Sequence, residues 1–393
     1  MDFNTIKKMD DTFVMHTYNR NQIAIDHGKG AHVYDTEGNG YIDFTSGIGV
    51  NCLGYGDEGW AEAIYEQAKK LGHMSNLYYT EPCAVLAEKL CTRTGMSKVF
   101  FGNSGAEANE GMIKLARKYS YDKYGEGRST VITLVDSFHG RTITTLNATG
   151  QDVFHQYFYP FTEGFRYAKA NEIEDLKACA GDDVCAVMVE LVQGEGGVNP
   201  LDPEYVKQVR ALCDENDWLM LVDEVQTGVG RTGKLFAFQH YDIVPDAVSF
   251  AKGIAGGLPM GGIMTPEKTQ DVLGPGTHAS TFGGNPLASA AACYVLDRLD
   301  DDMLDSITAK GDYLRSQLEG NGSPFIAEVR GKGLMIGIRL NGLTNTDVAA
   351  SLAGRGLLTL TAGNNVLRLL PPLTITTDEI ENGLGLLLGL IGN

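Results

Sequence analysis

Short apolar runs alternate with longer amphipathic segments through the middle of the chain. The apolar runs fall at residues 131–135, 184–192, 218–222 and 247–250. Runs of this length without polar interruptions are typical of strands that are buried on both faces. Because helix-length segments separate them, the pattern predicts an α/β fold whose mostly parallel sheet is covered by helices on both faces.

Three segments carry helix signals. Residues 105–124 and 285–300 follow helical patterns, and a third helix is predicted in DPEYVKQVRALCDEND. In that segment Asp202 is placed to cap a helix, and Pro203 suits the first helical position. These helices would connect or cover the predicted strands.

The two ends of the chain differ from its middle. Residues 28–50 are glycine-rich and strand-like. Further elements are predicted as strands at 326–340 and 357–370 and helices at 345–354 and 377–389. We expect residues 1–50 and 290–393 to join in a small α+β domain beside a large domain of residues 51–289.

Composition narrows the function classes. The formal net charge is -18, which argues against a nucleic-acid partner because such a partner requires a basic surface. The start, MDFNTIKKMDDTF, has no apolar signal region, and no apolar run approaches the roughly 18 residues of a membrane span. The 7 cysteines contain no CxxC pair, so neither a disulfide framework nor a zinc site is indicated. We expect a cytoplasmic protein without a membrane partner.

A glycine-rich turn follows the apolar segment VFF. Gly102, Asn103, Ser104 and Gly105 stand between this segment and the predicted helix 105–124. Backbone N–H groups and a hydroxyl at the positive end of a helix suit a phosphate group. An ordinary capped strand–helix turn is the alternative interpretation.

A carboxylate ends the predicted strand 218–222. Asp223 stands where open α/β sheets bind their ligands, and Gln226 follows three residues later. Asp223 could cap a helix, bind a metal or pair with a cationic ring nitrogen. No His or Cys stands nearby at ligand spacing, so no metal site is predicted.

A lysine follows the predicted strand 247–250. Lys252 comes directly after Phe250-Ala251 and before a glycine-rich bend. Most lysines are surface residues, but burial lowers the pKa of a lysine and makes its amine nucleophilic toward an aldehyde. Lys252 and Asp223 could face one crevice, because both follow strand ends.

Together these parts suit a ligand with a phosphate, a basic ring nitrogen and an aldehyde, as in pyridoxal 5′-phosphate. Asp223 would keep the ring nitrogen protonated, so that the ring accepts electrons. Phe138, in DSFHGRT, could stack on the ring or be an ordinary core aromatic.

Two arginines also follow strand-like runs, which is unusual for surface charges. They are Arg141 in FHGRT and Arg368 in NVLRLLPPL. A guanidinium binds a carboxylate with two parallel hydrogen bonds, so two such sites suit a dicarboxylic substrate such as glutamate. Structural salt bridges are the alternative.

Nine motifs, spread nearly end to end, resemble the class-III (subgroup II) aminotransferases of fold type I. They are YDTEGNGYIDFTSGIGVNCLG, HMSNLYYTEP, FGNSGAEANE, DSFHGRT, VQGEGG, LVDEVQTGVGRTG, FAKG, HASTFGGNPLA and NVLRLLPPL. The resemblance implies a large pyridoxal-phosphate domain with a seven-stranded sheet, a smaller α+β domain, and a homodimer with active sites at its interface. The stretches SGIGVNCLG and SNLYYTEP resemble the branch that acts on N²-acetylornithine.

The resemblance also implies roles for single residues. Lys252 would hold the cofactor as a Schiff base and move protons, and Arg368 would bind the α-carboxylate of glutamate. Arg141 would take the carboxylate far from the reacting amine, and Glu195 would neutralise Arg368 when the other substrate is bound. The implied cofactor contacts are Ser104, Gly105, Ala106, Phe138, Asp223, Glu224, Val225, Gln226, Lys252 and, from the second subunit, Thr281. Ser280 of that subunit would touch the substrate.

The implied reaction moves the δ-amino group of N²-acetylornithine to 2-oxoglutarate by a ping-pong mechanism. Succinylornithine, ornithine, 4-aminobutyrate and acylated lysine remain alternative donors, and an aminomutase would need no second keto acid. A nicotinamide-dependent dehydrogenase is disfavoured, because no GxGxxG follows a first strand with an acid about 20 residues later. A non-catalytic binding protein is disfavoured, because every residue that the chemistry requires is present.

Overall fold

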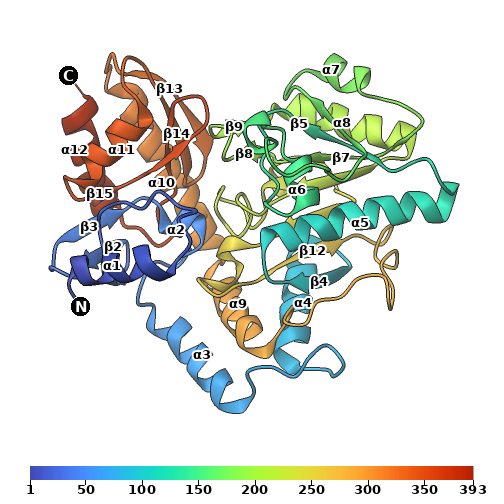
Figure 1. Cartoon of the computed structure of the whole chain (residues 1–393), viewed down its shortest axis with the longest axis horizontal. Helices are drawn as coiled ribbons and strands as arrows, with labels where there is room; N and C mark the ends of the chain where they lie inside the picture. Colours follow the sequence, from blue (N-terminus) through green and yellow to red (C-terminus); the bar gives the residue numbers. More distant parts are fainter. Residues whose placement is uncertain (393) are drawn as a thin grey trace.

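The computed structural model describes residues 1–392, and a seven-stranded sheet forms their centre (Figure 1). In spatial order its strands are β4 (Lys98–Gly102), β12 (Gly261–Thr265), β11 (Ala247–Phe250), β10 (Leu219–Asp223), β7 (Val184–Val189), β5 (Thr130–Leu134) and β6 (Phe165–Ala168). Within this sheet β12 alone runs antiparallel to its neighbours, β11 and β4. The predicted strands at 131–135, 184–192, 218–222 and 247–250 are present, and the mostly parallel α/β sheet is confirmed.

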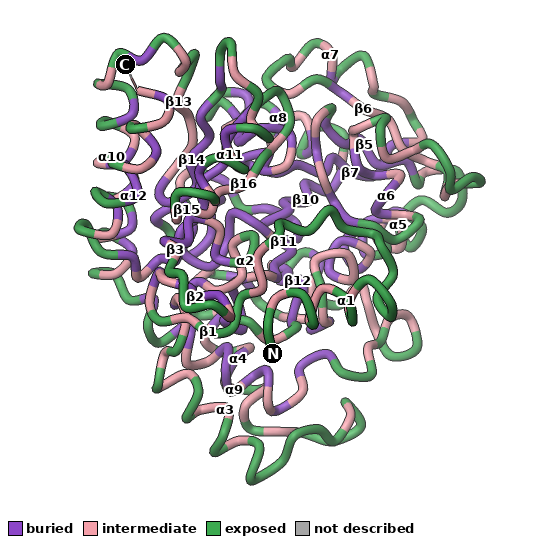
Figure 2. Tube along the Cα trace, turned by 60° about the vertical axis from the view of Figure 1, so that its left-hand side comes forward, coloured by how far each residue is buried: buried purple, intermediate pink, exposed green. Residues whose placement is uncertain are grey.

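The sheet separates two hydrophobic cores. On one face, Val131 and Leu219 pack with side chains of α5 (Gly105–Tyr124). On the other face, the neighbouring Ile132 and Met220 pack with side chains of α8 (Pro203–Asn216). Successive side chains of a strand point to opposite faces, so strands buried on both sides need continuous apolar runs. Figure 2 shows these strands as the buried centre of the molecule.

The remaining helices flank this sheet or follow the chain ends. Asp202 caps α8 by accepting a hydrogen bond from the backbone N–H of Glu204, and Pro203 is its first residue, as predicted. The other helices are α1 (Phe3–Phe13), α2 (Ser46–Gly49), α3 (Glu58–Lys70), α4 (Glu81–Thr94), α6 (Ile143–Ala148), α7 (Ile173–Ala178), α9 (Pro286–Arg298), α10 (Asp301–Gly320), α11 (Asn345–Ala353) and α12 (Thr377–Ile391), with 3-10 turns η1 (Asp152–Phe154), η2 (Ala237–His240) and η3 (Lys252–Ala255).

The two chain ends meet in space. A four-stranded sheet runs in the order β1, β2, β3 and β15, and β15 pairs in parallel with β3. Both ends lie together on the left of Figure 1. The smaller sheets contain β1 (Ile25–Lys29), β2 (His32–Asp35), β3 (Gly40–Asp43) and β15 (Leu357–Leu358); β13 (Ile326–Lys332), β14 (Met335–Leu340), β17 (Val366–Leu369) and β16 (Leu360–Ala362); and β8 (Val192–Gln193) with β9 (Asn199–Pro200).

The division into residues 51–289 and 1–50 with 290–393 stays a prediction. The second boundary falls inside α9, which packs against α3 and α4. None of the helices in residues 1–392 combines the length and apolar character needed to cross a membrane.

Candidate active site

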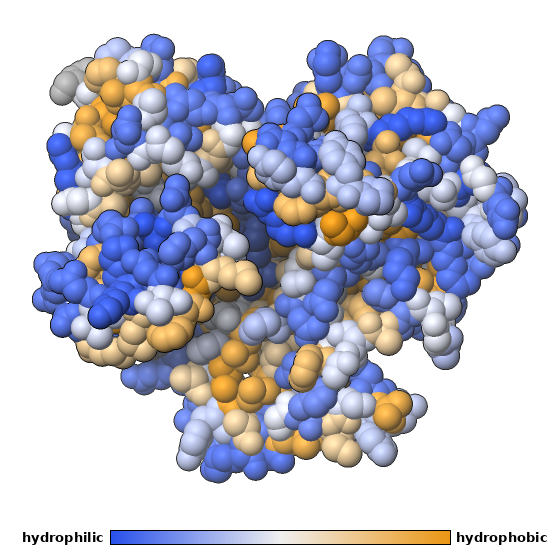
Figure 3. All heavy atoms as spheres, in the orientation of Figure 1, coloured by the Kyte–Doolittle hydropathy of each residue, from blue (hydrophilic) through white to orange (hydrophobic). Residues whose placement is uncertain are grey.

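A cavity of about 470 Å³ lies at the carboxyl edge of the central sheet. The strands β4, β5, β7, β10 and β11 all point to this edge, because β12 alone reverses direction. The residues at or just beyond their carboxyl ends therefore converge there. They include Ser104, Phe138, Glu190, Asp223 and Lys252. Figure 3 shows the surface hollowed between the part built from both chain ends and the central-sheet part.

The start of α5 forms one wall of the cavity. Ser104 caps the helix by accepting a hydrogen bond from the Glu107 backbone N–H at 3.2 Å. Gly105 follows, and a Cβ atom there would lie 2.7 Å from the nearest side-chain carbon of Val225. Only glycine lets the backbone approach this closely, so the first-turn N–H groups near Gly105 and Ala106 can receive an anion.

Asp223 lines the cavity and is only 3% exposed. Its Oδ2 is 2.7 Å from Asn109 Nδ2 and 2.8 Å from His139 Nδ1. Its Oδ1 accepts the Val225 backbone N–H at 2.9 Å and the Ser249 hydroxyl at 3.4 Å. These donors fix the orientation of the carboxylate.

Glu190 is a second buried carboxyl in the cavity wall. It accepts hydrogen bonds from the backbone N–H groups of Phe138 at 2.8 Å and Gly194 at 3.1 Å. Burial, with the nearby charge of Asp223 adding to it, raises the pKa of Glu190 to about 7. Glu190 therefore ties together the two loops that carry Phe138 and Glu195.

Lys252 directly follows β11 and its Ala251 neighbour, in a left-handed conformation with φ 45°. A non-glycine residue in this region is strained, and such strain concentrates at functional sites. Burial, together with the nearby charge of Arg368, lowers the pKa of Lys252 although the carboxylates of Glu195 and Asp223 oppose this shift. The amine is thus held closer to its uncharged, nucleophilic form.

Arg368 is buried beside the cavity and paired with a carboxylate. Its guanidinium binds both oxygens of Glu195, at 2.7 and 3.1 Å. It also donates to Gln226 Oε1 at 3.0 Å. Burial opposes ionisation of Glu195, but the charge and hydrogen bonds of Arg368 outweigh it and lower the pKa of Glu195. The structure therefore brings the predicted residues Glu195, Gln226 and Arg368 into one cluster.

Arg141 lines the same cavity near Phe138 and is exposed to solvent. Its guanidinium carbon lies 5.3 Å from the centre of the Phe138 ring. The two arginines thus differ, since Arg368 is neutralised by a carboxylate whereas Arg141 meets an aromatic face.

Five predicted residues do not line this cavity: Glu195 and Arg368, which adjoin it through Gln226, and Glu224, Ser280 and Thr281. Glu224 turns away from it, because its carboxylate accepts hydrogen bonds from the backbone of Ala237 and Phe238 and from the Thr227 hydroxyl. The structure therefore corrects the prediction for the Glu224 side chain, which anchors the following loop. Ser280 and Thr281 are not among the residues that line the cavity. They were predicted to serve a second subunit, which one chain does not test.

The family model described as "Aminotransferase class-III" matches residues 14–390. An acetylornithine aminotransferase of Haemophilus ducreyi is 49% identical over 389 residues, which cover 98% of each chain. Among solved structures, N-acetylornithine aminotransferase of Stenotrophomonas maltophilia is 36% identical with a TM-score of 0.85, covering 98% of each chain. Ornithine aminotransferase of Toxoplasma gondii is 32% identical with a TM-score of 0.94, covering 99% of this chain and 94% of that one.

The chain belongs to the class-III aminotransferases. These are pyridoxal-phosphate enzymes, and the predicted fold type I is confirmed. The cavity of this aminotransferase fits that cofactor. It offers a helix start without room for a Cβ atom, a buried carboxylate and a lysine with a lowered pKa. Residues 1–392 contain no cluster of His, Cys, Asp and Glu that could hold a metal ion.

Sequence reasoning missed three polar residues of the aminotransferase cavity. They are Asn109, His139 and Glu190. Asn109 follows Gly105 by one helical turn, which places it on the same face of α5. Glu190 is the first charged residue after an apolar strand, a signal equivalent to that of Asp223. His139 adjoins Phe138, but its contact with Asp223 depends on the tertiary structure.

Proposed function

We propose that this class-III aminotransferase transfers the δ-amino group of N²-acetylornithine to 2-oxoglutarate, yielding N-acetylglutamate 5-semialdehyde and glutamate. One observation carries the proposal: Lys252, Asp223 and Arg141 line one cavity, and Arg368, neutralised by Glu195, adjoins it through its hydrogen bond to Gln226. Likeness to acetylornithine aminotransferases over nearly the whole chain supports the choice of donor.

The residues divide into those that hold the cofactor and those that hold substrate. Gly105 and Ala106 would bind the phosphate with the N–H groups of α5, while Phe138 and Val225 would lie against the ring. Asp223 would pair with the ring nitrogen, and Gln226 would reach the phenolic oxygen. When bound, pyridoxal phosphate supplies an aldehyde that combines with amines and a ring that accepts electrons from the substrate carbon.

Lys252 would first hold the cofactor and then act as the general base. Because its pKa is lowered by burial, a fraction of the freed amine is uncharged and can take a proton from the substrate carbon. The same amine would then return that proton to the carbon atom that carries the aldehyde of the free cofactor. Asp223 would retain its negative charge opposite the ring nitrogen throughout.

The two arginines would let one cavity accept both substrates. Arg141 would bind the carboxylate farthest from the reacting amine, which N²-acetylornithine and 2-oxoglutarate both possess. Arg368 would stay paired with Glu195 while the δ-amine reacts, since that carbon carries no carboxylate. When the keto acid enters, Glu195 would release Arg368 to bind the α-carboxylate. Ping-pong kinetics follow because the first product leaves its amino group behind in the enzyme before the keto acid enters the same cavity.

A second copy of the chain would complete the site. We propose a cytoplasmic homodimer in which Thr281 helps to bind the phosphate and Ser280 touches the substrate of the neighbouring subunit. The exposed position of Thr281 and the seven free thiols support this assignment.

A comparison of amine donors tests the proposal. With 2-oxoglutarate as acceptor, kcat/KM for N²-acetylornithine should exceed the values for ornithine, succinylornithine and 4-aminobutyrate. The variant Lys252→Ala should lower turnover by about 10⁴-fold or more, because it removes the general base. Lys69→Ala is the matched control, since Lys69 lies on the surface helix α3.

Two results would count against the assignment. Near wild-type turnover by Lys252→Ala would refute the role of the lysine. A higher kcat/KM for ornithine than for its acetylated form would keep the aminotransferase class and replace the substrate.

A further inference from the structure

Arg141 contacts a second aromatic ring that comes from a separate segment. Its guanidinium carbon lies 4.1 Å from the centre of the Phe154 ring, closer than the 5.3 Å to Phe138. The two rings meet edge to face, with centres 5.9 Å apart and planes at 79°. The guanidinium therefore lies against two ring faces set nearly at right angles, which restricts its orientation.

This environment leaves the charge of Arg141 uncompensated. Arg141 forms no ion pair with a carboxylate of residues 1–392, whereas Arg210 pairs with both Asp214 and Asp246. An aromatic face attracts a guanidinium without occupying its N–H donors, which lie in the guanidinium plane. Arg141 thus keeps its donors available for a carboxylate from substrate.

Phe154 is fixed relative to the loop that carries Arg141. The backbone of Gly150 is joined to Asp136 and to the Ser137 hydroxyl by hydrogen bonds of 2.8 and 3.0 Å. Gln151 Nε2 donates to the Ser137 carbonyl at 2.9 Å. The backbone N–H of Phe154 donates to the Gln151 carbonyl at 3.0 Å, which forms the turn η1. The two segments therefore behave as one framework around the guanidinium.

We propose that Phe154 is a positioning residue that aims Arg141 at the substrate carboxylate farthest from the reacting amine. The inference rests on the proposed function, because it takes Arg141 as the carboxylate site. Phe154 acts through Arg141 and touches neither the amine nor the cofactor. It strengthens binding of substrates that carry this carboxylate and leaves the chemistry at the amine unchanged.

The variant Phe154→Leu removes the aromatic face and keeps an apolar side chain of moderate size. In enzyme loaded with pyridoxal phosphate, we expect Kd for glutarate to rise about 3- to 20-fold by calorimetry. KM for N²-acetylornithine should rise by a similar factor, with kcat changed less than about twofold. The single-turnover rate with N-(4-aminobutyl)acetamide, which is the donor without its carboxylate, should not change.

Two further variants serve as controls. Phe154→Tyr keeps the ring and should restore glutarate binding to within about twofold of wild type. Tyr157→Leu removes an exposed aromatic residue three positions away, whose ring packs against Phe158 and not against Arg141. It should leave glutarate binding unchanged.

The outcomes separate the inference from the proposed function. Unchanged glutarate binding in Phe154→Leu would overturn the inference, as would equal losses with the carboxylate-free amine. If wild-type enzyme binds glutarate through Arg141 yet fails to turn over N²-acetylornithine, the proposed function fails while the role of Phe154 still stands.

Discussion

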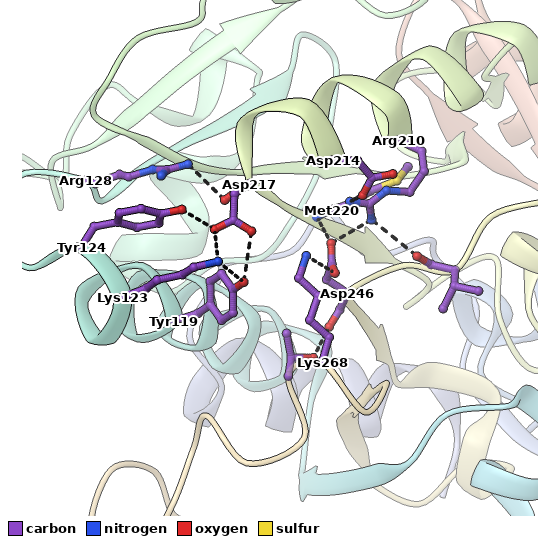
Figure 4. A network of polar contacts seen from close by, with 12 residues as sticks. Tyr119, Lys123, Tyr124, Arg128, Arg210, Asp214, Asp217, Met220, Asp246 and Lys268 are labelled. Carbon is purple, nitrogen blue, oxygen red and sulfur yellow. Dashed lines mark hydrogen bonds and ion pairs between the residues drawn. The ribbon is translucent and has the colours of Figure 1, made fainter.

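A buried aspartate lies beside each end of strand β10, but the two have opposite surroundings. At the amino end, Asp246 is 4% exposed and accepts the Met220 backbone N–H at 2.8 Å. Arg210 and Lys268 both lie 2.8 Å from its carboxylate (Figure 4). At the carboxyl end, Asp223 is 3% exposed and forms no ion pair with a lysine or arginine of the described chain.

This difference separates a structural charge from one reserved for a ligand. The positive charges of Arg210 and Lys268 neutralise Asp246, so its carboxylate needs no further cationic partner. Asp223 instead receives an amide, a hydroxyl, a backbone N–H and an imidazole. These groups hold the carboxylate without a fixed positive charge, which leaves it able to attract a cationic ring nitrogen. Burial alone would not distinguish the two aspartates.

Replacing Asp223 should have the largest effect on catalysis. Asp223→Asn keeps the shape but removes the negative charge opposite the ring nitrogen. We expect kcat to fall on the order of 10³-fold, because a preorganised charge in a dry site is lost. Steady-state kinetics with N²-acetylornithine measure this, and circular dichroism checks that the fold persists. A loss below about tenfold would contradict the assignment.

Replacing Asp246 should lower stability and leave catalysis nearly unchanged. Asp246→Asn leaves Arg210 and Lys268 without their carboxylate, so we expect a loss of about 2–4 kcal/mol in the free energy of unfolding. The kcat of the folded enzyme should stay within about twofold of wild type. Denaturant unfolding measures the first effect. A large fall in kcat with stability intact would erase the distinction between the two aspartates.

Two buried glutamates allow a second comparison, in the pH dependence of stability. Burial raises the pKa values of both Glu190 and Glu224 from 4.5 to about 7. The folded state therefore binds these protons more tightly than the unfolded state, and both groups make stability fall as pH rises from about 4.5 to about 7. Replacing either glutamate with glutamine should reduce this pH-dependent loss in the free energy of unfolding, by an amount on the order of 2 kcal/mol.

Unfolding midpoints measured across that pH range test the effect on stability. Only Glu190 lines the cavity, so Glu190→Gln alone should also change the pH dependence of the bound cofactor's visible absorbance. The same spectral change in Glu224→Gln would show that proximity to the cavity is not its cause.

Most of the central fold could be predicted from sequence, because strands buried on both faces need continuous apolar runs. Strand β12 escaped this rule. It begins with two glycines, and a Cβ atom at Gly262 would lie 2.4 Å from the Phe100 carbonyl oxygen. Because the neighbouring backbone leaves no room for a side chain at Gly262, the start of β12 lacks the apolar residues by which a buried strand is predicted. Helix α10 was overlooked although its buried positions, such as Leu304, Ile307 and Leu314, have helical spacing.

The candidate site was partly predictable, since strand ends of a parallel sheet share one edge. That rule brought Asp223, Lys252 and the turn at Ser104 together. It could not give the direction of a side chain, so Glu224 was placed in the site although its carboxylate faces another loop. Nor could it reveal the partner of Arg141, because Phe154 reaches that guanidinium through a turn outside every recognised motif.

The pairing of β15 with β3 constrains how the polypeptide folds during its synthesis. The β3 edge at Ile42 and Asp43 is synthesised early, yet its partner at Leu357 and Leu358 emerges only near the end of translation. Until then the nascent chain presents an unpaired strand edge, because β3 pairs only with β2, and such an edge is an aggregation hazard. Premature termination before Leu357 would leave that edge permanently open, even with every strand of the central sheet already made.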